Sequence, residues 1–392
     1  MRCNSLLRHI LLVWAMVIPS LAAAQHSIDI EAGITANYSD GELAPYYTMS
    51  NRYGTLTQGR SALMNVKLEH SLDSTQRFSY GYGAELWGGW ASSADYARYD
   101  ASSQTWSQNG QHPSRVWLQQ LYGAVKYRGL SYTIGVQEHR NAMIDAALGS
   151  GDLILSGNAR PMPGIRIGFV DFQDMPFTKG WVQVSGEIGI YKDAQDQWLK
   201  NHYGYYNSII TTGSYTNYKR WYFRTNPSQP VSVTVGLQSA CQFFGERSWY
   251  YRGALVGKDR MKPTLKSFLT AIIPSKGNES SSLEGDANFC EGNHLGSWDL
   301  AVRYQIDAQS TLRGYWQSPM EDGSGIGKLN GWDGLYGLEY RSARRGLLTG
   351  AAVEYIDFTN QSGPIHWAPG DFPGTHITDQ ATGADDYYNN YF

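Results

Sequence analysis

The sequence predicts an all-β fold: a large, antiparallel, up-and-down β-barrel that spans a bacterial outer membrane. Three observations predict it, namely a period-two alternation of apolar and polar residues, connections that alternate in length, and an export signal at the N-terminus. The composition agrees, because 14% of the 392 residues are aromatic, only 17% are charged and 43 are glycine. Aromatic residues are common in half-buried β-strands, and glycine is common in tight turns and where another group approaches a strand closely.

The alternation of apolar and polar residues is the first observation, and it recurs along most of the chain. After Ser27, one face carries Ile28, Ile30, Ala32, Ile34 and Ala36, and the other carries Asp29, Glu31, Thr35 and Asn37. This period predicts strands near 27–38, 60–71, 76–90, 115–127, 130–138, 165–172, 181–191, 218–226, 230–243, 296–307, 311–317, 333–341 and 347–359. Many approach the ~9–11 residues that a tilted membrane strand needs, although a soluble sandwich would accept the same lengths.

The lengths of the connections separate the barrel from the sandwich. Short connections such as "RG" (128–129) and "DAQS" (307–310) alternate with long ones such as 91–114 and 244–295. Outer-membrane barrels have short periplasmic turns and long outer loops, whereas a Greek-key sandwich has no reason to alternate in this way. The N-terminus is therefore expected in the periplasm, with apolar faces toward lipid and polar faces toward the lumen.

The N-terminus carries the third observation. Arg2 and Arg8 precede a short apolar run, and "SLAAAQ" follows it, which is the pattern of a secretory signal peptide over residues 1–24. A membrane anchor is the alternative, but the apolar run from Ile10 to Ile18 is too short to span a bilayer. The remaining residues, 25–392, are expected to form one outer-membrane barrel domain.

The predicted strand count is odd, and the tail after Asn360 shows no further strand pattern. An open edge in hydrocarbon would leave backbone groups without partners, so a membrane barrel must close. We therefore expect that this chain is truncated at its C-terminus and lacks its closing strands.

Four motifs in order, "SGNARPMPGIRIG", "GNHLGSWDLAVRY", "VEYIDFTNQSGP" and "DDYYNNYF", resemble the capsule assembly protein Wzi family, especially its Bacteroides-type branch. The resemblance covers nearly the whole mature chain. It implies a closed barrel of about eighteen strands, within the range of such barrels. It also implies a surface lectin that binds capsular polysaccharide and assists capsule assembly or attachment. Enterobacterial members of the family carry an N-terminal periplasmic helical bundle, whereas here the strand pattern begins almost at the expected cleavage site. Members of the Bacteroides-type branch continue into further strands after a "YYNN"-like motif, at which this sequence ends.

The expected partners are capsular polysaccharide, outer-membrane lipid and lipopolysaccharide, and the capsule export machinery. A net charge of -3 does not provide the positive electrostatic potential that nucleic-acid binding needs. No residue spacing indicates a metal site, a cofactor site or catalytic residues, so we do not expect an enzyme. The alternative function is a passive outer-membrane porin for small solutes or oligosaccharides.

Arg160 is a candidate carbohydrate-binding residue. It lies in "SGNARPMPG" (156–164), an outer connection that Pro161 and Pro163 stiffen and exclude from the sheet ladder. Its guanidinium offers five fixed donors, which suit a carboxylate or vicinal hydroxyls of an acidic sugar. The alternative is an ion pair with Glu138 or Asp152 that only braces the loop.

Aromatic residues in the outer loops are the other binding candidates. Flat rings with a polar tip can stack on sugars and hydrogen-bond their hydroxyls, although an aromatic girdle at the membrane interface is the alternative. The candidates lie deep in the loops and are Trp106, Trp198, Trp249 and Tyr250.

The longest outer loop, 244–295, contains "MKPTLKSFLTAII", in which apolar residues recur at helical spacing. We expect a short amphipathic helix there, packed over or into the barrel mouth, with a strand pair at the rim as the alternative. Cys241 and Cys290 bracket this loop, and in an oxidising compartment they could form a disulfide. Isolated thiols are the alternative.

Overall fold

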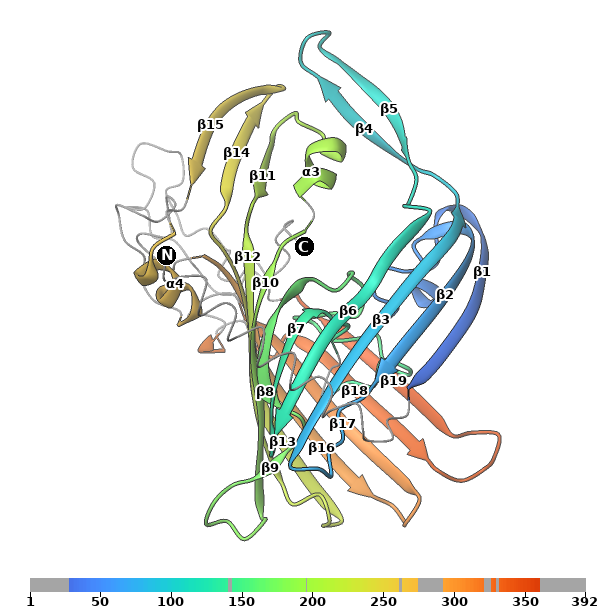
Figure 1. Ribbon diagram of the computed structural model, residues 1–392, viewed down its shortest axis with the longest axis vertical. Helices are drawn as coiled ribbons and strands as arrows, with labels where there is room; N and C mark the ends of the chain where they lie inside the picture. Colours follow the sequence, from blue (N-terminus) through green and yellow to red (C-terminus); the bar gives the residue numbers. More distant parts are fainter. Residues whose placement is uncertain are drawn as a thin grey trace, which may run out of the picture.

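The computed structural model describes residues 28–139, 143–194, 196–260, 263–273, 292–320, 326–328 and 331–359. The predicted signal peptide, the C-terminal tail and Cys290 lie outside these residues. The structure confirms the predicted fold class, since long antiparallel strands form one large curved sheet (Figure 1).

The sheet follows the chain, because each strand pairs with the wall strands before and after it in the sequence. Its first strands are β1 (Asp29–Leu43), β2 (Gln58–His70), β3 (Phe78–Ala91), β6 (Val116–Tyr127), β7 (Leu130–Val136) and β8 (Pro163–Phe169). It continues through β10 (Val182–Lys192), β12 (Tyr215–Thr225), β13 (Val231–Phe243), β16 (Asn293–Gln305), β17 (Ser310–Met320), β18 (Gly334–Ser342) and β19 (Gly350–Asp357). A short strand, β9 (Gln173–Asp174), pairs only with β10.

The two faces of the sheet differ in polarity. Along β1, Ile30 and Ile34 project outward and are exposed, as are Val353 and Tyr355 on β19. Polar side chains such as Gln119 and Gln317 project inward and are buried. Exposing an apolar surface of this extent to water costs free energy, and contact with lipid acyl chains removes that cost. The chain therefore has the architecture of a membrane-spanning β-barrel.

Within the described ranges, no helix is both long enough and apolar enough to cross a membrane.

The connections alternate in length as the sequence predicts. One end of the barrel has tight turns, such as the two residues Arg128 and Gly129 between β6 and β7. Arg128 takes a positive φ of 54° in this turn. The other end carries long connections, including those between β3 and β6 and between β13 and β16. We call this the outer end.

Several outer connections contain secondary structure, most of which the sequence pattern does not predict. The loop 244–295 is the exception, because it contains both the expected helix and a strand pair. The connections form a hairpin, β4 (Ala94–Asp100) with β5 (Thr105–Gln111), and a three-stranded sheet of β11 (Ser208–Thr212), β14 (Glu246–Tyr251) and β15 (Ala254–Arg260). The helices are α2 (Tyr46–Met49), α3 (Asp196–His202) and α4 (Leu265–Ile272), and α4 lies where helical spacing predicts a helix. Figure 1 shows the β4–β5 hairpin and the three-stranded sheet rising from the outer end, with α3 between them.

The sheet is open in the part of the chain that the structure describes. There, β1 pairs only with β2, and β19 pairs only with β18. The closed barrel of about eighteen strands that the family resemblance implies is thus not seen in the described strands.

Candidate functional site

Aromatic side chains gather where the β4–β5 hairpin, the α3 region and the three-stranded sheet meet. We call this group the outer aromatic cluster. Its members are Tyr96, Tyr99, Trp106, Trp198, His202, Tyr205, Tyr206 and Tyr250. They come from three connections that are far apart in the sequence, so the cluster exists only in the folded chain.

The first part of the cluster joins the hairpin to the loop after α3. The Tyr99 ring contacts the Trp106 ring at 5.3 Å and the Tyr206 ring at 4.9 Å between centroids. Trp106 and Tyr206 also meet, at 5.6 Å. A backbone hydrogen bond from Tyr99 N–H to the Gly204 carbonyl, at 2.9 Å, fixes the hairpin to this loop. Tilted and edge-to-face pairs of this kind stabilise an aromatic group beyond its buried area.

The second part is built on α3. Trp198 stacks on His202 one turn later, with ring centroids 5.0 Å apart and an interplanar angle of 12°. His202 Nδ1 lies 2.8 Å from the Trp198 carbonyl, and its ring meets Tyr96 of the hairpin at 4.8 Å. Residues four apart lie on one face of a helix, so this spacing places both rings toward the hairpin.

The third part joins the same loop to β14. The Tyr205 ring meets Tyr250 edge-on at 4.8 Å, and the Arg98 guanidinium lies 5.2 Å from the centroid of the Tyr205 ring. The Tyr205 hydroxyl donates to the Lys200 carbonyl at 2.6 Å. Partial burial raises the pKa of Tyr205, so this hydroxyl stays protonated at neutral pH.

One glycine is required for this packing. Gly253, in the turn between β14 and β15, has φ +82°, and a Cβ there would lie 2.5 Å from Tyr99 Cε1. Only glycine combines this backbone conformation with so close an approach of an aromatic ring.

The structure brings three of the four predicted aromatic residues into the cluster. Trp106 and Trp198 are 53% and 47% exposed, so both have ring surface to offer a ligand. Tyr250 joins them through Tyr205. Trp249 does not join in this way: the Arg247 guanidinium lies 5.1 Å from its ring centroid, and Gly257 lies against it. His202 was missed, because nothing in its sequence context distinguishes it from other loop histidines.

Arg160 lies apart from the cluster, at the inner rim of the barrel mouth. Its guanidinium stacks over the Trp117 ring at 4.6 Å, and Trp117 in turn stacks on Trp87 at 6.0 Å. Among the described residues Arg160 makes no ion pair, so the alternative of a pair with Glu138 or Asp152 is wrong. Those carboxylates instead accept hydrogen bonds from amide side chains, Glu138 from Gln119 at 3.1 Å. Burial lowers the pKa of Arg160, but arginine remains charged at neutral pH.

Residues 143–160, which we call the lumenal segment, cross the inside of the barrel. Asp152 is buried there and accepts hydrogen bonds from Gln238 of β13 at 2.9 Å and Gln317 of β17 at 3.1 Å. It also accepts from the backbone N–H of Ile154 at 2.8 Å. A buried carboxylate with several donors holds its segment firmly, because each lost bond leaves a buried polar group unsatisfied.

The lumenal segment also links the two ends of the sheet. The Ser150 N–H donates to Glu354 of β19 at 2.7 Å, and the Tyr315 hydroxyl donates to the same carboxylate at 2.6 Å. On the other side, Asn51 of the β1–β2 connection donates to the Gly149 carbonyl at 2.9 Å. The segment therefore bridges β1–β2 and β19, which do not pair directly in the described strands.

Apolar side chains complete the packing of the lumenal segment. Met143 and Ile144 are buried with Tyr222, Tyr315 and Leu335 of the wall. Ile154 is buried with Tyr218 and Ala240. The lumenal segment thus packs against the inner face of the wall.

Cys241 is fully buried in β13. Cys290 lies outside the described residues, so the disulfide between them stays a prediction. Among the described residues, no group of three or more His, Cys, Asp or Glu side chains has the geometry of a metal site.

No protein-family model matches the chain, and no curated protein matches it. Solved structures that resemble it include a mutant of Rh. blastica porin, with a TM-score of 0.30 and 10% identity, covering 85% of this chain and 96% of that one. Another is Salmonella typhi OmpF in complex with daunomycin, with a TM-score of 0.34 and 8% identity, covering 86% and 92%.

Proposed function

We propose that the protein is an outer-membrane lectin that binds capsular polysaccharide and assists capsule assembly or attachment at the cell surface, as in the Wzi family that its motifs resemble. The observation that carries the proposal is the outer aromatic cluster, which stands above the barrel on three separate connections. In this proposal the chain is exported by its signal peptide, and its partners are the capsule, lipopolysaccharide and the capsule export machinery.

The composition of the cluster suits a sugar ligand. Trp106 and Trp198 expose indole rings, which can stack on the C–H faces of pyranose rings. Tyrosine hydroxyls, the His202 ring and the Arg98 guanidinium surround them and can bond sugar hydroxyls. The rings already pack against one another in the free protein, so binding costs little side-chain entropy.

The passive porin remains the alternative, because a barrel wall with a polar inner face suits a pore. The lumenal segment counts against it, since Asp152 and Glu354 fix this segment across the lumen. A lectin needs no open lumen. We propose no catalytic role and no cofactor.

Binding of fluorescent capsular polysaccharide from the host cell to the protein in proteoliposomes tests the proposal. We expect saturable binding that the double variant Trp106→Ala with Trp198→Ala abolishes. The matched control is Trp181→Ala, because Trp181 is 59% exposed but lies at the opposite end of the barrel, beside the start of β10. Absence of binding together with a steady, large conductance would overturn the lectin in favour of the porin.

A further inference from the structure

Helix α4 packs against the outside of the barrel wall, so the expectation that it lies over or in the mouth is wrong. Along β13, Val231 and Val235 project outward and are exposed, whereas Gln238 projects inward and bonds Asp152 and Asp299. Successive residues of a strand alternate between faces. Cys241 and Phe243 therefore project outward, on the same face as Val231 and Val235.

These two outward residues are nevertheless 0% and 2% exposed. They form a buried cluster with Ala271 of α4, and the ring centroids of Phe243 and Phe268 lie 6.0 Å apart. Ile190 of β10 packs against the same cluster. Thus α4 lies over the outer ends of β10 and β13, on the side of the wall that faces away from the lumen.

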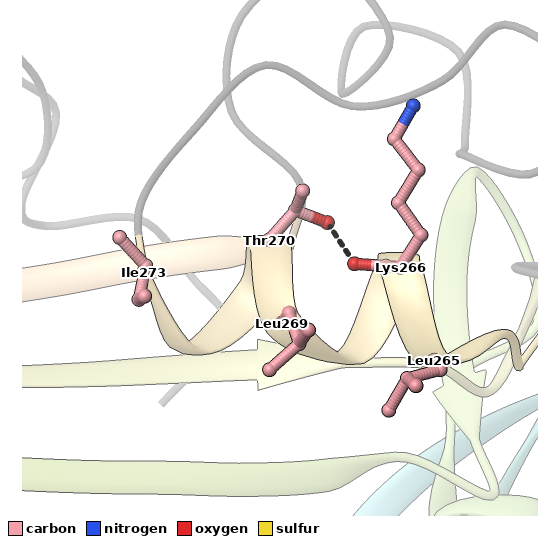
Figure 2. A pocket seen from close by; sticks show the side chains of 5 residues that line it. All are labelled: Leu265, Lys266, Leu269, Thr270 and Ile273. Carbon is pink, nitrogen blue, oxygen red and sulfur yellow. Dashed lines mark hydrogen bonds between the residues drawn. The ribbon is translucent and has the colours of Figure 1, made fainter.

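The opposite side of α4 is apolar, and its side chains are exposed. Figure 2 shows Leu265, Leu269 and Ile273 along one side of the helix, where they line a shallow depression with Lys266 and Thr270. The three apolar residues are four apart, so they form one stripe, and they are 76%, 49% and 67% exposed. Thr264 caps the helix through the Ser267 N–H at 3.1 Å, which makes the helix end well defined.

On the wall, α4 lies where the exposed part of the apolar band ends. From Ile28, just before β1, to Tyr38 the outward apolar residues of the first strand span about 34 Å, whereas on β13 the outward apolar residues that α4 leaves uncovered run only from Val231 to Leu237, about 20 Å. A barrel of this kind has an apolar band of about 25 Å, which a strand tilted by about 40° crosses in about ten residues. On β13 the remaining outer part of the band coincides with Cys241 and Phe243, beneath α4.

A polar residue beneath the helix supports the same conclusion. Asn217 of β12 pairs with Cys241 and so shares its outward face. It is fully buried and donates to the Gly189 carbonyl at 2.8 Å. A bare amide in the lipid-facing wall would be costly. Burial in this region removes Asn217 from contact with lipid.

We propose that α4 lies at the outer boundary of the bilayer and completes the apolar band with its own stripe. Leu265, Leu269 and Ile273 contact the acyl chains of the outer leaflet, and the Lys266 ammonium extends toward lipid phosphates. The partner of this surface is lipid, continuous with the lipid that surrounds the rest of the wall. The proposal rests on the barrel fold alone and is independent of polysaccharide binding.

Spin-label accessibility tests this placement in the full chain, reconstituted in vesicles of phosphatidylethanolamine and phosphatidylglycerol. Leu269→Cys is labelled in a background that carries Cys3→Ser and Cys290→Ser and keeps the buried Cys241. Val235→Cys serves as the lipid-facing reference and Ser103→Cys, in the β4–β5 turn, as the water-facing one. We expect the ratio of oxygen to nickel-chelate accessibility at position 269 to match position 235 and to exceed position 103 several-fold.

Leu265→Cys is the second variant, for the case in which a label at 269 disturbs the helix. A ratio at both positions equal to that of position 103 would overturn the proposal, because the stripe would then face water. Low accessibility to both oxygen and the nickel chelate at both positions would also overturn the proposal, because protein would then cover the stripe.

Discussion

The lumenal segment and the outer aromatic cluster are both built from connections at the outer end of the barrel, but different forces hold them. The lumenal segment is fixed by buried hydrogen bonds, above all those that Asp152 accepts from Gln238 and Gln317. The cluster is held by ring contacts at half-exposed positions such as Trp106 and Tyr206.

This difference separates stability from binding. Removing a buried hydrogen-bond partner costs folding free energy, because the groups left behind stay desolvated. Removing an exposed ring costs little stability, but it removes contact surface for a ligand. Variants in the lumenal segment should therefore lower the free energy of unfolding and alter the conductance. Variants in the cluster should mainly lower the affinity for polysaccharide.

The largest effect is expected for Asp152→Ala. The variant leaves the Gln317 amide and the Ile154 N–H without this acceptor, at a cost of about 3 kcal/mol in the free energy of unfolding. We also expect channel openings in planar bilayers, because the segment loses its hold on β13 and β17. Urea titration in detergent micelles measures the first effect, and Asp40→Ala at an exposed position is the control. Unchanged stability would show that the segment is held by its apolar contacts.

The next effect concerns binding. Trp106→Ala should weaken binding of capsular polysaccharide by about 2 kcal/mol, roughly thirtyfold, because a central aromatic contact is lost. The free energy of unfolding should fall by only about 1 kcal/mol, since the half-exposed ring loses its contacts with Tyr99 and Tyr206. Titration of the labelled polysaccharide and urea titration measure the two quantities. A large loss of stability without a loss of affinity would make the cluster structural, like the lumenal segment.

Arg160 is the last residue of the lumenal segment, but its guanidinium stacks on Trp117 and is proposed as a binding group. Arg160→Gln should weaken binding of an acidic capsule by about 1 kcal/mol, roughly fivefold, because a guanidinium that stacks on Trp117 and can bond a sugar carboxylate is lost. The same capsule with its carboxyl groups reduced to alcohols should bind both proteins equally. Arg128→Gln is the matched control, since Arg128 lies over Tyr127 at 5.7 Å but at the opposite end of the barrel. Equal loss with both polysaccharides would assign Arg160 a bracing role.

How far the sequence predicts these regions depends on what each strand buries. The wall strands have one lipid face and one lumenal face, so their alternation is strong: the prediction of 230–243 corresponds to β13 at Val231–Phe243. The β4–β5 hairpin has exposed and half-buried residues but no fully buried one, so it carries no such signal and the sequence pattern does not predict it. Among the site residues, Trp106 and Trp198 follow from loop position and residue type. Their contacts with Tyr206 and His202 depend on how distant connections pack, which one sequence does not reveal.

The smallest effect concerns the β14–β15 hairpin that carries Tyr250. There Lys258 Nζ donates to Glu246 Oε1 at 2.8 Å, and this hydrogen bond lowers the pKa of Glu246 and raises the pKa of Lys258. The contribution of Glu246 is present above its unfolded pKa of about 4.3 and is lost as pH falls through the lower folded value. That of Lys258 is complete below about 10.4 and is lost as pH rises through the higher folded value.

Polysaccharide affinity should therefore be flat between about pH 5 and 10 as far as this pair is concerned. Because the pair is solvent-exposed, Glu246→Gln should change affinity at pH 7 by less than about twofold. Affinity measured from pH 7 down to pH 3 should fall less steeply in Glu246→Gln than in the parent, since only the parent loses the charged pair. Parallel pH profiles would show instead that the orientation of Tyr250 depends on its ring contact with Tyr205 and not on the hairpin charge pair.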